Sequence, residues 1–187
     1  MGKIYETIEE RVAEFIRRQK MFFVATAPLA AEGLINLSPK GLDSFRILDE
    51  KTVAYLDLTG SGVETIAHAK ENGRITVMFC AFEGAPNILR LYGQAEVLEP
   101  DHPDFASLRE LFPHLPGTRS IIRIHVQRIA DSCGYAVPKY DFVEDRSTLI
   151  DYSVSKGPAG LVEYRQQKNA ASLDGLKGLD NFDGATA

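Results

Sequence analysis

Asp57–Gly93 reads DLTGSGVETIAHAKENGRITVMFCAFEGAPNILRLYG, and this segment decides the fold. Its opening LTGSG favours a turn, because two glycines and two hydroxyl residues are poor strand formers. Apolar residues then recur at helical spacing from Val63 to Glu71, which predicts a helix. The β-like runs Arg74–Phe82 and Ile88–Leu98 follow on either side of the turn EGAP, and together they predict a hairpin.

The turn before this helix has two interpretations. A helix start presents unpaired backbone N–H groups and the positive end of the dipole, so Gly60–Gly62 is a candidate seat for a phosphate. Gly/Ser turns that merely cap a helix are far more numerous, and neither a P-loop nor a dinucleotide fingerprint is present. From these residues alone, a helix cap is the favoured interpretation.

Four short β segments are expected before this helix, each bounded by turn residues. They are Met21–Ala27, Leu34–Lys40, Phe45–Leu48 and Thr52–Leu58. The first two and the last two are candidate hairpins, and their spacing favours a meander. Upstream, Ile4–Gln19 places Ile8, Val12, Phe15 and Ile16 on one face opposite charged residues, which predicts an amphipathic surface helix.

Downstream, Asp101–Phe112 has helical spacing, with Asp101 as the expected N-cap. Ser120–Ile129 is the last predicted strand, because apolar and polar residues alternate along it. About seven strands with few helices predict a mainly β fold, an antiparallel barrel with flanking helices.

The chain beyond Ser132 has a different character, in which short helical patterns alternate with Gly157-Pro158. We expect a single domain over residues 1–187, with its core at about residues 1–132. A helical wrap is expected at about residues 140–172, packed on the barrel or on a second subunit. The tail, residues 173–187, has a composition that predicts disorder.

Charge and hydropathy exclude several classes of partner. The net charge is −5 with both signs interspersed, so no basic stripe is available for nucleic acid. The longest apolar runs are shorter than the roughly 20 residues that span a bilayer, and the charged N-terminus does not resemble a secretion signal. We therefore expect neither nucleic acid nor a membrane as a partner.

Cysteine and histidine usage gives no sign of a metal site. Cys80 and Cys133 form neither a disulfide framework nor a metal-ligand spacing, and a reducing, cytoplasmic location is expected. His68 and His125 have no Cys, Asp or Glu cluster at metal-binding distance in the sequence. Cys133 is interpreted as structural, with a redox thiol as the alternative.

Three motifs carry a family resemblance: NLSPKG at Asn36–Gly41, GSGVETIAHAKENGRITVMFCAFEG at Gly60–Gly84, and ILRLYGQAEVL at Ile88–Leu98. They resemble the pyridoxamine 5′-phosphate oxidase-related family over roughly the first two thirds of the chain. The resemblance implies a split β-barrel, a homodimer, and FMN held in a cleft between the two subunits. The segment SCGYAVP at Ser132–Pro138 is similar to a less characterised branch.

The same resemblance implies where the cofactor binds. The family's strand motif falls on Ile35–Lys40, and its second element falls on Leu58-Thr59 and Glu64-Thr65. True pyridoxamine phosphate oxidases place Arg and Lys where this chain has Glu64 and Thr65, and a glutamate does not bind phosphate. The implied cofactor-binding residues are Ser38, Lys40, Thr59, Ser61, Gly62, Thr65 and Arg90.

Two of these residues have alternatives that the sequence leaves open. Lys40 by itself would be interpreted as a solvated lysine at a strand end. Arg90 lies in the apolar strand ILRLYG, where a lone buried charge is costly. It therefore meets an anion, pairs with an acid such as Glu96, or lies on an exposed face.

Two classes of function follow. In the first, the protein is an FMN-dependent oxidoreductase acting on a small organic substrate, with the flavin as redox centre. In the second, it is a non-catalytic flavin- or ligand-binding module, with deazaflavin or haem as alternatives to FMN. No catalytic residue is assigned. Vitamin B6 oxidation is not expected, because the chain has no tryptophan and so lacks the family's Trp- and Arg-containing substrate motif.

Overall fold

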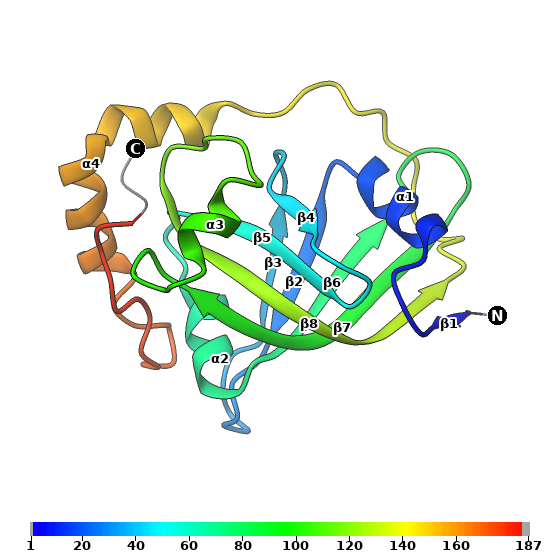
Figure 1. Cartoon of the computed structure of the whole chain (residues 1–187), viewed down its shortest axis with the longest axis horizontal. Helices are drawn as coiled ribbons and strands as arrows, with labels where there is room; N and C mark the ends of the chain where they lie inside the picture. Colours follow the sequence, from blue (N-terminus) through cyan, green and yellow to red (C-terminus); the bar gives the residue numbers. More distant parts are fainter. Residues whose placement is uncertain (1, 185–187) are drawn as a thin grey trace.

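Within residues 2–184, which a computed structural model describes, the chain forms eight strands and four helices (Figure 1). In chain order they are β1 (Ile4–Tyr5), α1 (Glu10–Arg18), β2 (Phe22–Thr26), β3 (Asn36–Lys40), β4 (Phe45–Ile47), β5 (Thr52–Leu58), α2 (Glu64–Asn72), β6 (Arg74–Cys80), β7 (Ile88–Leu98), α3 (Phe105–Arg109), β8 (Thr118–Ser132) and α4 (Thr148–Lys168).

The eight strands form one antiparallel sheet in the order β3-β2-β6-β7-β8-β5-β4, with β1 paired to the end of β8. The sheet curls into a half-barrel around the long strands β7 and β8 (Figure 1). Gly93 lies where the β7–β8 register shifts, and a Cβ there would overlap the His125 carbonyl oxygen. Only glycine permits this close approach of two backbones. The predicted mainly β class and split antiparallel barrel are confirmed.

The strand pairs that local spacing predicts are present, but the meander is wrong. The hairpins β2–β3, β4–β5 and β6–β7 all form. However, β2 also pairs with β6 and β5 also pairs with β8, so β3 and β4 end at opposite edges of the sheet. Pairing between distant strands decides the order, and the spacing of neighbouring runs does not encode it.

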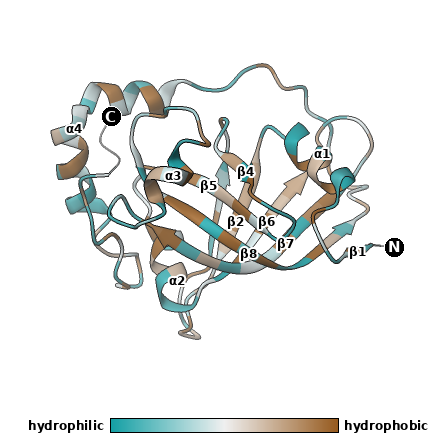
Figure 2. Cartoon of the chain, viewed as in Figure 1, coloured by the Kyte–Doolittle hydropathy of each residue, from teal (hydrophilic) through white to brown (hydrophobic). Residues whose placement is uncertain are grey.

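Strand β5 separates two apolar clusters. Val53 and Tyr55 point into the main core inside the half-barrel. Ala54 and Leu56 point to the other side, where Phe105 of α3 covers them. Both faces of this strand are therefore buried. Figure 2 shows the same distribution, with apolar residues concentrated in the strands of the sheet.

The N-terminal helix is shorter than predicted. The pattern predicts one helix over Ile4–Gln19, whereas α1 begins only at Glu10. Ile4–Tyr5 instead pairs with β8, and the Tyr5 hydroxyl donates a 2.6 Å hydrogen bond to the Asp131 carboxylate. Tertiary hydrogen bonds therefore override a helical pattern in the first residues.

The helix expected over Asp101–Phe112 is reduced to α3. Its N-cap position is Asp104, which makes no side-chain capping bond, so Asp101 is not the cap. Pro103 explains the late start, because a proline disfavours helical backbone at the residue before it.

The C-terminal part folds along the end of the barrel that carries α2 (Figure 1). Helix α4 is broken at Gly157, whose φ of 64° is left-handed, and Pro158 begins its second half. The stretch predicted to be disordered is described as far as Gly184, and Leu179 within it is buried in the main core. Residues 185–187 lie outside the described part. No helix within residues 2–184 has the length and apolar character that crossing a membrane requires.

Candidate functional site

A wide groove of about 1520 Å³ runs along one side of the half-barrel. Ligand pockets commonly measure about 300–1,000 Å³, so this groove exceeds the space that one small ligand needs. Its walls come from α1, β3, the start of α2, β8, the loop between β6 and β7, and the segment between β8 and α4. That segment, residues 133–147, contains neither helix nor strand, and we call it the strap.

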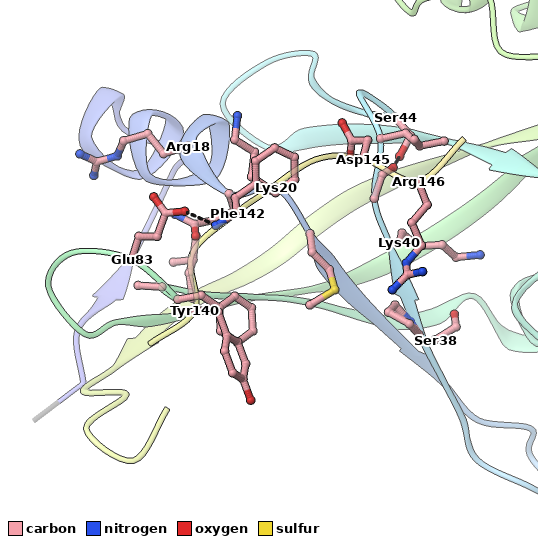
Figure 3. A pocket seen from close by; sticks show the side chains of 18 of the residues that line it. Arg18, Lys20, Ser38, Lys40, Ser44, Glu83, Tyr140, Phe142, Asp145 and Arg146 are labelled. Atoms are coloured by element: carbon pink, nitrogen blue, oxygen red, sulfur yellow. Dashed lines mark hydrogen bonds between the residues drawn. The ribbon is translucent and has the colours of Figure 1, made fainter. Parts of the chain in front are cut away.

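The side chains of the groove fall into two groups in Figure 3. One group contains Ser38 and Lys40 of β3 together with Ser44 and Asp145, and Arg146 of the strap is directed towards Ser38 and Lys40. The other contains Lys20 together with Tyr140 and Phe142 of the strap. The groove therefore has a polar, cationic end on β3 and an end with aromatic side chains.

The cationic end is built on a buried carboxylate. Asp57 Oδ2 lies 2.6 Å from Arg119 Nε, and Asp57 Oδ1 lies 3.2 Å from Lys40 Nζ. Burial acts to raise the pKa of Asp57, but the positive charges of Arg119 and Lys40 outweigh it and hold the pKa below its ordinary value of 3.8. One carboxylate thus neutralises part of two cations.

A β-bulge aims Arg119 at this carboxylate. Asp57 pairs with Ser120 and Leu58 pairs with Thr118, so Arg119 is the extra residue on β8. Its two terminal nitrogens donate to the carbonyl oxygens of Gly60 and Gly62. The turn before α2 is consequently held in place by an arginine from a different strand.

Glu64 changes the character of the helix start. Its carboxylate folds back towards Gly62, and Oε1 accepts a 3.4 Å hydrogen bond from the Leu173 backbone N–H. A carboxylate at this point already interacts favourably with the positive end of the helix dipole. An anionic ligand group at the helix start would meet like-charge repulsion, so the favourable place for it lies towards Lys40.

Two hydroxyl groups near Lys40 lack a hydrogen-bond partner within residues 2–184. They belong to Ser38 on the groove wall and to Tyr55 beneath it. Lys40 Nζ lies 5.9 Å from the centre of the Tyr55 ring. A buried hydroxyl without a partner costs about 1–3 kcal/mol, so a ligand that bonds Ser38 would recover this cost.

A polar chain connects the groove with a buried histidine. Asn36 Nδ2 donates to the hydroxyl oxygens of Thr65, at 3.0 Å, and Thr26, at 3.2 Å. The Thr26 hydroxyl in turn lies 2.9 Å from Nδ1 of His68. Burial lowers the pKa of His68, which favours the neutral imidazole in this network. This series of hydrogen bonds fixes the Asn36 and Thr65 side chains in the groove wall.

Comparison with known proteins identifies the family. A family model described as pyridoxamine 5′-phosphate oxidase matches residues 8–133. The chain belongs to the pyridoxamine 5′-phosphate oxidase family. The match ends at residue 133, the first residue of the strap, so the rest of the strap and α4 lie outside it.

One relative and two solved structures are similar to this chain. The family protein ustO of Aspergillus flavus is 39% identical over 198 residues, which cover 96% of this chain and 78% of ustO. A variant of HupZ from Group A Streptococcus superposes with a TM-score of 0.53 at 26% identity, covering 67% of this chain and 99% of that one. A Clostridium acetobutylicum protein related to general stress protein 26 superposes at 0.51 with 17% identity, covering 66% and 87%, which shows the fold alone.

The groove brings together four of the residues that the family resemblance implies. Ser38, Lys40, Gly62 and Thr65 all line it. The expectation that Ser38 and Lys40 share one strand face agrees with their common place on the groove wall. These four residues are therefore the part of the predicted cofactor site that the tertiary structure assembles.

The other three implied residues lie elsewhere. The Thr59 hydroxyl is buried, donating to the Gly117 carbonyl and accepting a 2.8 Å hydrogen bond from Arg165 Nε. Ser61 is exposed and is not among the residues that line the groove. Arg90 is also absent from the lining and donates a 3.0 Å hydrogen bond to Ser132. Glu96, its suggested partner, pairs with Arg123 instead.

Sequence reasoning missed Arg119 and Arg146. A charged residue at the start of the apolar run TRSIIRI was the available signal for Arg119. Its partner Asp57 is 62 positions away, and no local spacing links them. Arg146 carries no motif, and only the course of the strap places it over the groove.

The two cysteines do not form a disulfide with each other. Cys80 is buried on β6, where burial raises the pKa of its thiol, and Cys133 is exposed at the start of the strap. Both are free thiols. Within residues 2–184, no group of three or more His, Cys, Asp or Glu side chains is arranged to hold a metal ion.

Proposed function

We propose that this protein binds FMN in the groove and acts as an oxidoreductase on a small organic substrate. One observation supports this most strongly: the Ser38 hydroxyl, which has no hydrogen-bond partner within residues 2–184, lies in the same wall as the Lys40 ammonium, in a chain of the pyridoxamine 5′-phosphate oxidase family. A hydroxyl and a cation in one wall suit a ligand with a phosphate or another anionic oxygen.

The residues of the groove match the chemistry of FMN. Lys40 would bind the phosphate, with the hydroxyls of Ser38 and Thr65 as hydrogen-bond donors. Asn36 offers its amide oxygen to the polar edge of the ring, because its amide nitrogen already donates to Thr26 and Thr65. FMN, when bound, supplies the redox chemistry, which ordinary side chains do not provide. The protein's part is to bind and orient the FMN and to shield it from water.

We further propose a homodimer in which a second copy covers the exposed edge of the sheet. Strand β3 is an edge strand. Its residue Leu37 is 65% exposed, and Ile35, just before the strand, is 77% exposed. Exposed apolar residues on a sheet edge favour association. Self-association is the simplest closed arrangement, because two-fold dimers are the commonest oligomers. Sedimentation that gives a stable 20.7 kDa species with flavin bound, at micromolar concentration, would contradict this proposal.

The volume of the groove leaves room for a substrate beside the cofactor. The end with Lys20, Tyr140 and Phe142 is the remaining space once the β3 end is filled. Lys20 Nζ lies 5.3 Å from the centre of the Phe142 ring, so an aromatic face and a cation are both available there.

The test uses the purified protein and its absorption spectrum. We expect bound flavin that bleaches with NADH or NADPH under anaerobic conditions and recovers its colour in air. Bound flavin that stays oxidised with every donor would favour a non-catalytic flavin-binding module. Protein that takes up neither FMN nor riboflavin, but binds a deazaflavin or haem, would overturn the assignment of FMN.

A further inference from the structure

We propose that Arg146 of the strap supplies the second cation for the cofactor phosphate, in place of the basic side chains that are absent from the start of α2. This inference rests on the proposed function, because it assigns a binding role within the same groove. It concerns a residue outside the family match, which ends at position 133.

The cations already at the β3 end are largely committed to the protein itself. Lys40 and Arg119 share the single carboxylate of Asp57. Arg119 also donates to two backbone carbonyls, and its side chain is 4% exposed. The two cations and Asp57 together carry one net positive charge. A phosphate dianion carries two negative charges, so it needs a further cation.

The helix start does not make up the difference. Position 64 is a glutamate whose carboxylate folds back over Gly62. Its neighbour Thr65 contributes a hydroxyl but no charge, and that hydroxyl already accepts from Asn36. A cation for the phosphate therefore has to come from another part of the chain.

Arg146 meets this requirement. It lines the groove, and its side chain extends from the strap towards Ser38 and Lys40 (Figure 3). Among the hydrogen bonds and ion pairs within residues 2–184, none engages the Arg146 guanidinium. A guanidinium that faces a groove without a protein partner is available to an anionic ligand, and its planar donors match phosphate oxygens.

The strap is anchored on both sides of this residue. The Tyr140 backbone N–H donates to the Phe82 carbonyl at 3.0 Å, and the Phe142 N–H donates to Glu83 at 3.2 Å. The rings of Tyr140 and Phe82 lie 5.5 Å apart. On the other side, Ser147 donates a 2.6 Å hydrogen bond to Asp151 in α4. Arg146 is thus held over the groove by the strap's own contacts.

The experiment compares FMN with riboflavin, which lacks the phosphate, in two single-charge variants. Arg146→Ala removes the proposed contact, and Lys139→Ala removes a positive charge from the same strap at a position that does not line the groove. Flavin affinity is measured by fluorescence titration at two salt concentrations, with thermal unfolding as a check that each variant folds.

We expect Arg146→Ala to weaken FMN binding about tenfold to a hundredfold, which corresponds to the loss of one charge-assisted hydrogen bond. Riboflavin binding should change less than about twofold, and Lys139→Ala should change neither affinity. Arg146→Lys should restore part of the loss and keep the salt dependence of FMN binding.

Four results would overturn the inference. Wild-type FMN affinity in Arg146→Ala, with a loss in Lys40→Ala, would remove Arg146 from the site and leave the proposed function standing. Equal losses of FMN and riboflavin would assign the strap a steric role only, and an equal loss in Lys139→Ala would indicate a general charge effect. If the wild-type protein binds neither flavin, the proposed function and this inference both fall.

Discussion

Asp57 Oδ2 lies 2.6 Å from Arg119 Nε, although the residues are 62 positions apart and their side chains are 0% and 4% exposed. The pair joins the end of β5 to the bulge in β8, and through Arg119 it also holds the turn that begins α2. A contact that holds strand, bulge and turn together makes the cationic end of the groove a rigid part of the barrel.

We expect Asp57→Asn to destabilise the protein by about 3–5 kcal/mol, because it leaves the buried guanidinium of Arg119 without its counter-charge. Urea unfolding measures the change. Asp43→Asn is the matched control, since Asp43 forms an exposed pair with Arg46 and its loss should change stability by about 0–1 kcal/mol. Equal losses of stability in the two variants would show that the buried pair stabilises the protein no more than the exposed pair does.

The same pair predicts a dependence of stability on acid. The folded-state pKa of Asp57 is lower than its ordinary value of 3.8, so its contribution is complete above that value and is lost as the pH falls through the folded pKa. The free energy of unfolding of the wild type should therefore fall more steeply below this pH than that of Asp57→Asn. If the free energies of unfolding of the two proteins depend on pH in the same way, the lowered pKa of Asp57 is contradicted.

Lys40→Ala should weaken FMN binding about tenfold to a hundredfold and leave folding nearly unchanged. Asp57 keeps Arg119, its closer partner, in this variant, so the buried carboxylate is not left without a counter-charge and the loss in stability is smaller than in Asp57→Asn. Ser61→Ala should weaken binding less, because Ser61 does not line the groove.

Riboflavin is the control for Lys40. Without a phosphate, it should bind the wild type and Lys40→Ala about equally. A riboflavin loss as large as the FMN loss would place Lys40 away from the phosphate, and unchanged FMN affinity would remove it from the site.

His68 should make the protein less stable in mildly acidic solution. Burial lowers its folded-state pKa below the ordinary value of 6.5, and the nearby acids Asp174, Glu64 and Glu71 offset only part of this. Below 6.5 the unfolded chain gains a proton that the folded chain does not, so the free energy of unfolding falls as the pH drops towards the folded pKa.

The check is chemical denaturation between pH 8 and 5, taken as roughly the window in which histidine titrates. His68→Asn keeps a polar group near Thr26 but cannot titrate, so its stability should depend less on pH than that of the wild type. His114→Asn, at an exposed position, should retain the wild-type slope. An unchanged slope in His68→Asn would show that His68 does not set it.

Arg165→Met should loosen the C-terminal segment. The guanidinium donates to Thr59 Oγ1 and to the carbonyls of Phe182 and Asp183, and burial, together with nearby Arg119, lowers its pKa to about 10. Of the three acceptors, the Thr59 hydroxyl oxygen is buried, and the loss of its donor costs about 1–3 kcal/mol, whereas methionine keeps most of the volume.

Limited proteolysis and urea unfolding test this prediction. Cleavage near the C-terminus should become faster in Arg165→Met, and the unfolding midpoint should fall. Arg17→Met, which breaks only the exposed pair with Glu10, serves as the control. If the two variants resist protease equally well, Arg165 does not secure the tail.

Much of this protein follows from its sequence alone. The hairpins β2–β3, β4–β5 and β6–β7, the helix that follows Gly60–Gly62, and the shared face of Ser38 and Lys40 all depend on neighbours within one or two elements. Alternation, helical spacing and turn residues express such local relationships directly. The family motifs lie in these same elements, which is why the resemblance pointed to a strand that lines the groove.

The tertiary structure alone decided the rest. The order of the strands, the bulge that aims Arg119 at Asp57, and the strap that carries Arg146 over the groove all join residues far apart in the chain. Nor did periodicity show that Thr59 would bond with Arg165. The sequence does not show which residue a charged side chain will pair with. The register of distant strands decides which side chains meet, and burial decides which of these charges need a partner.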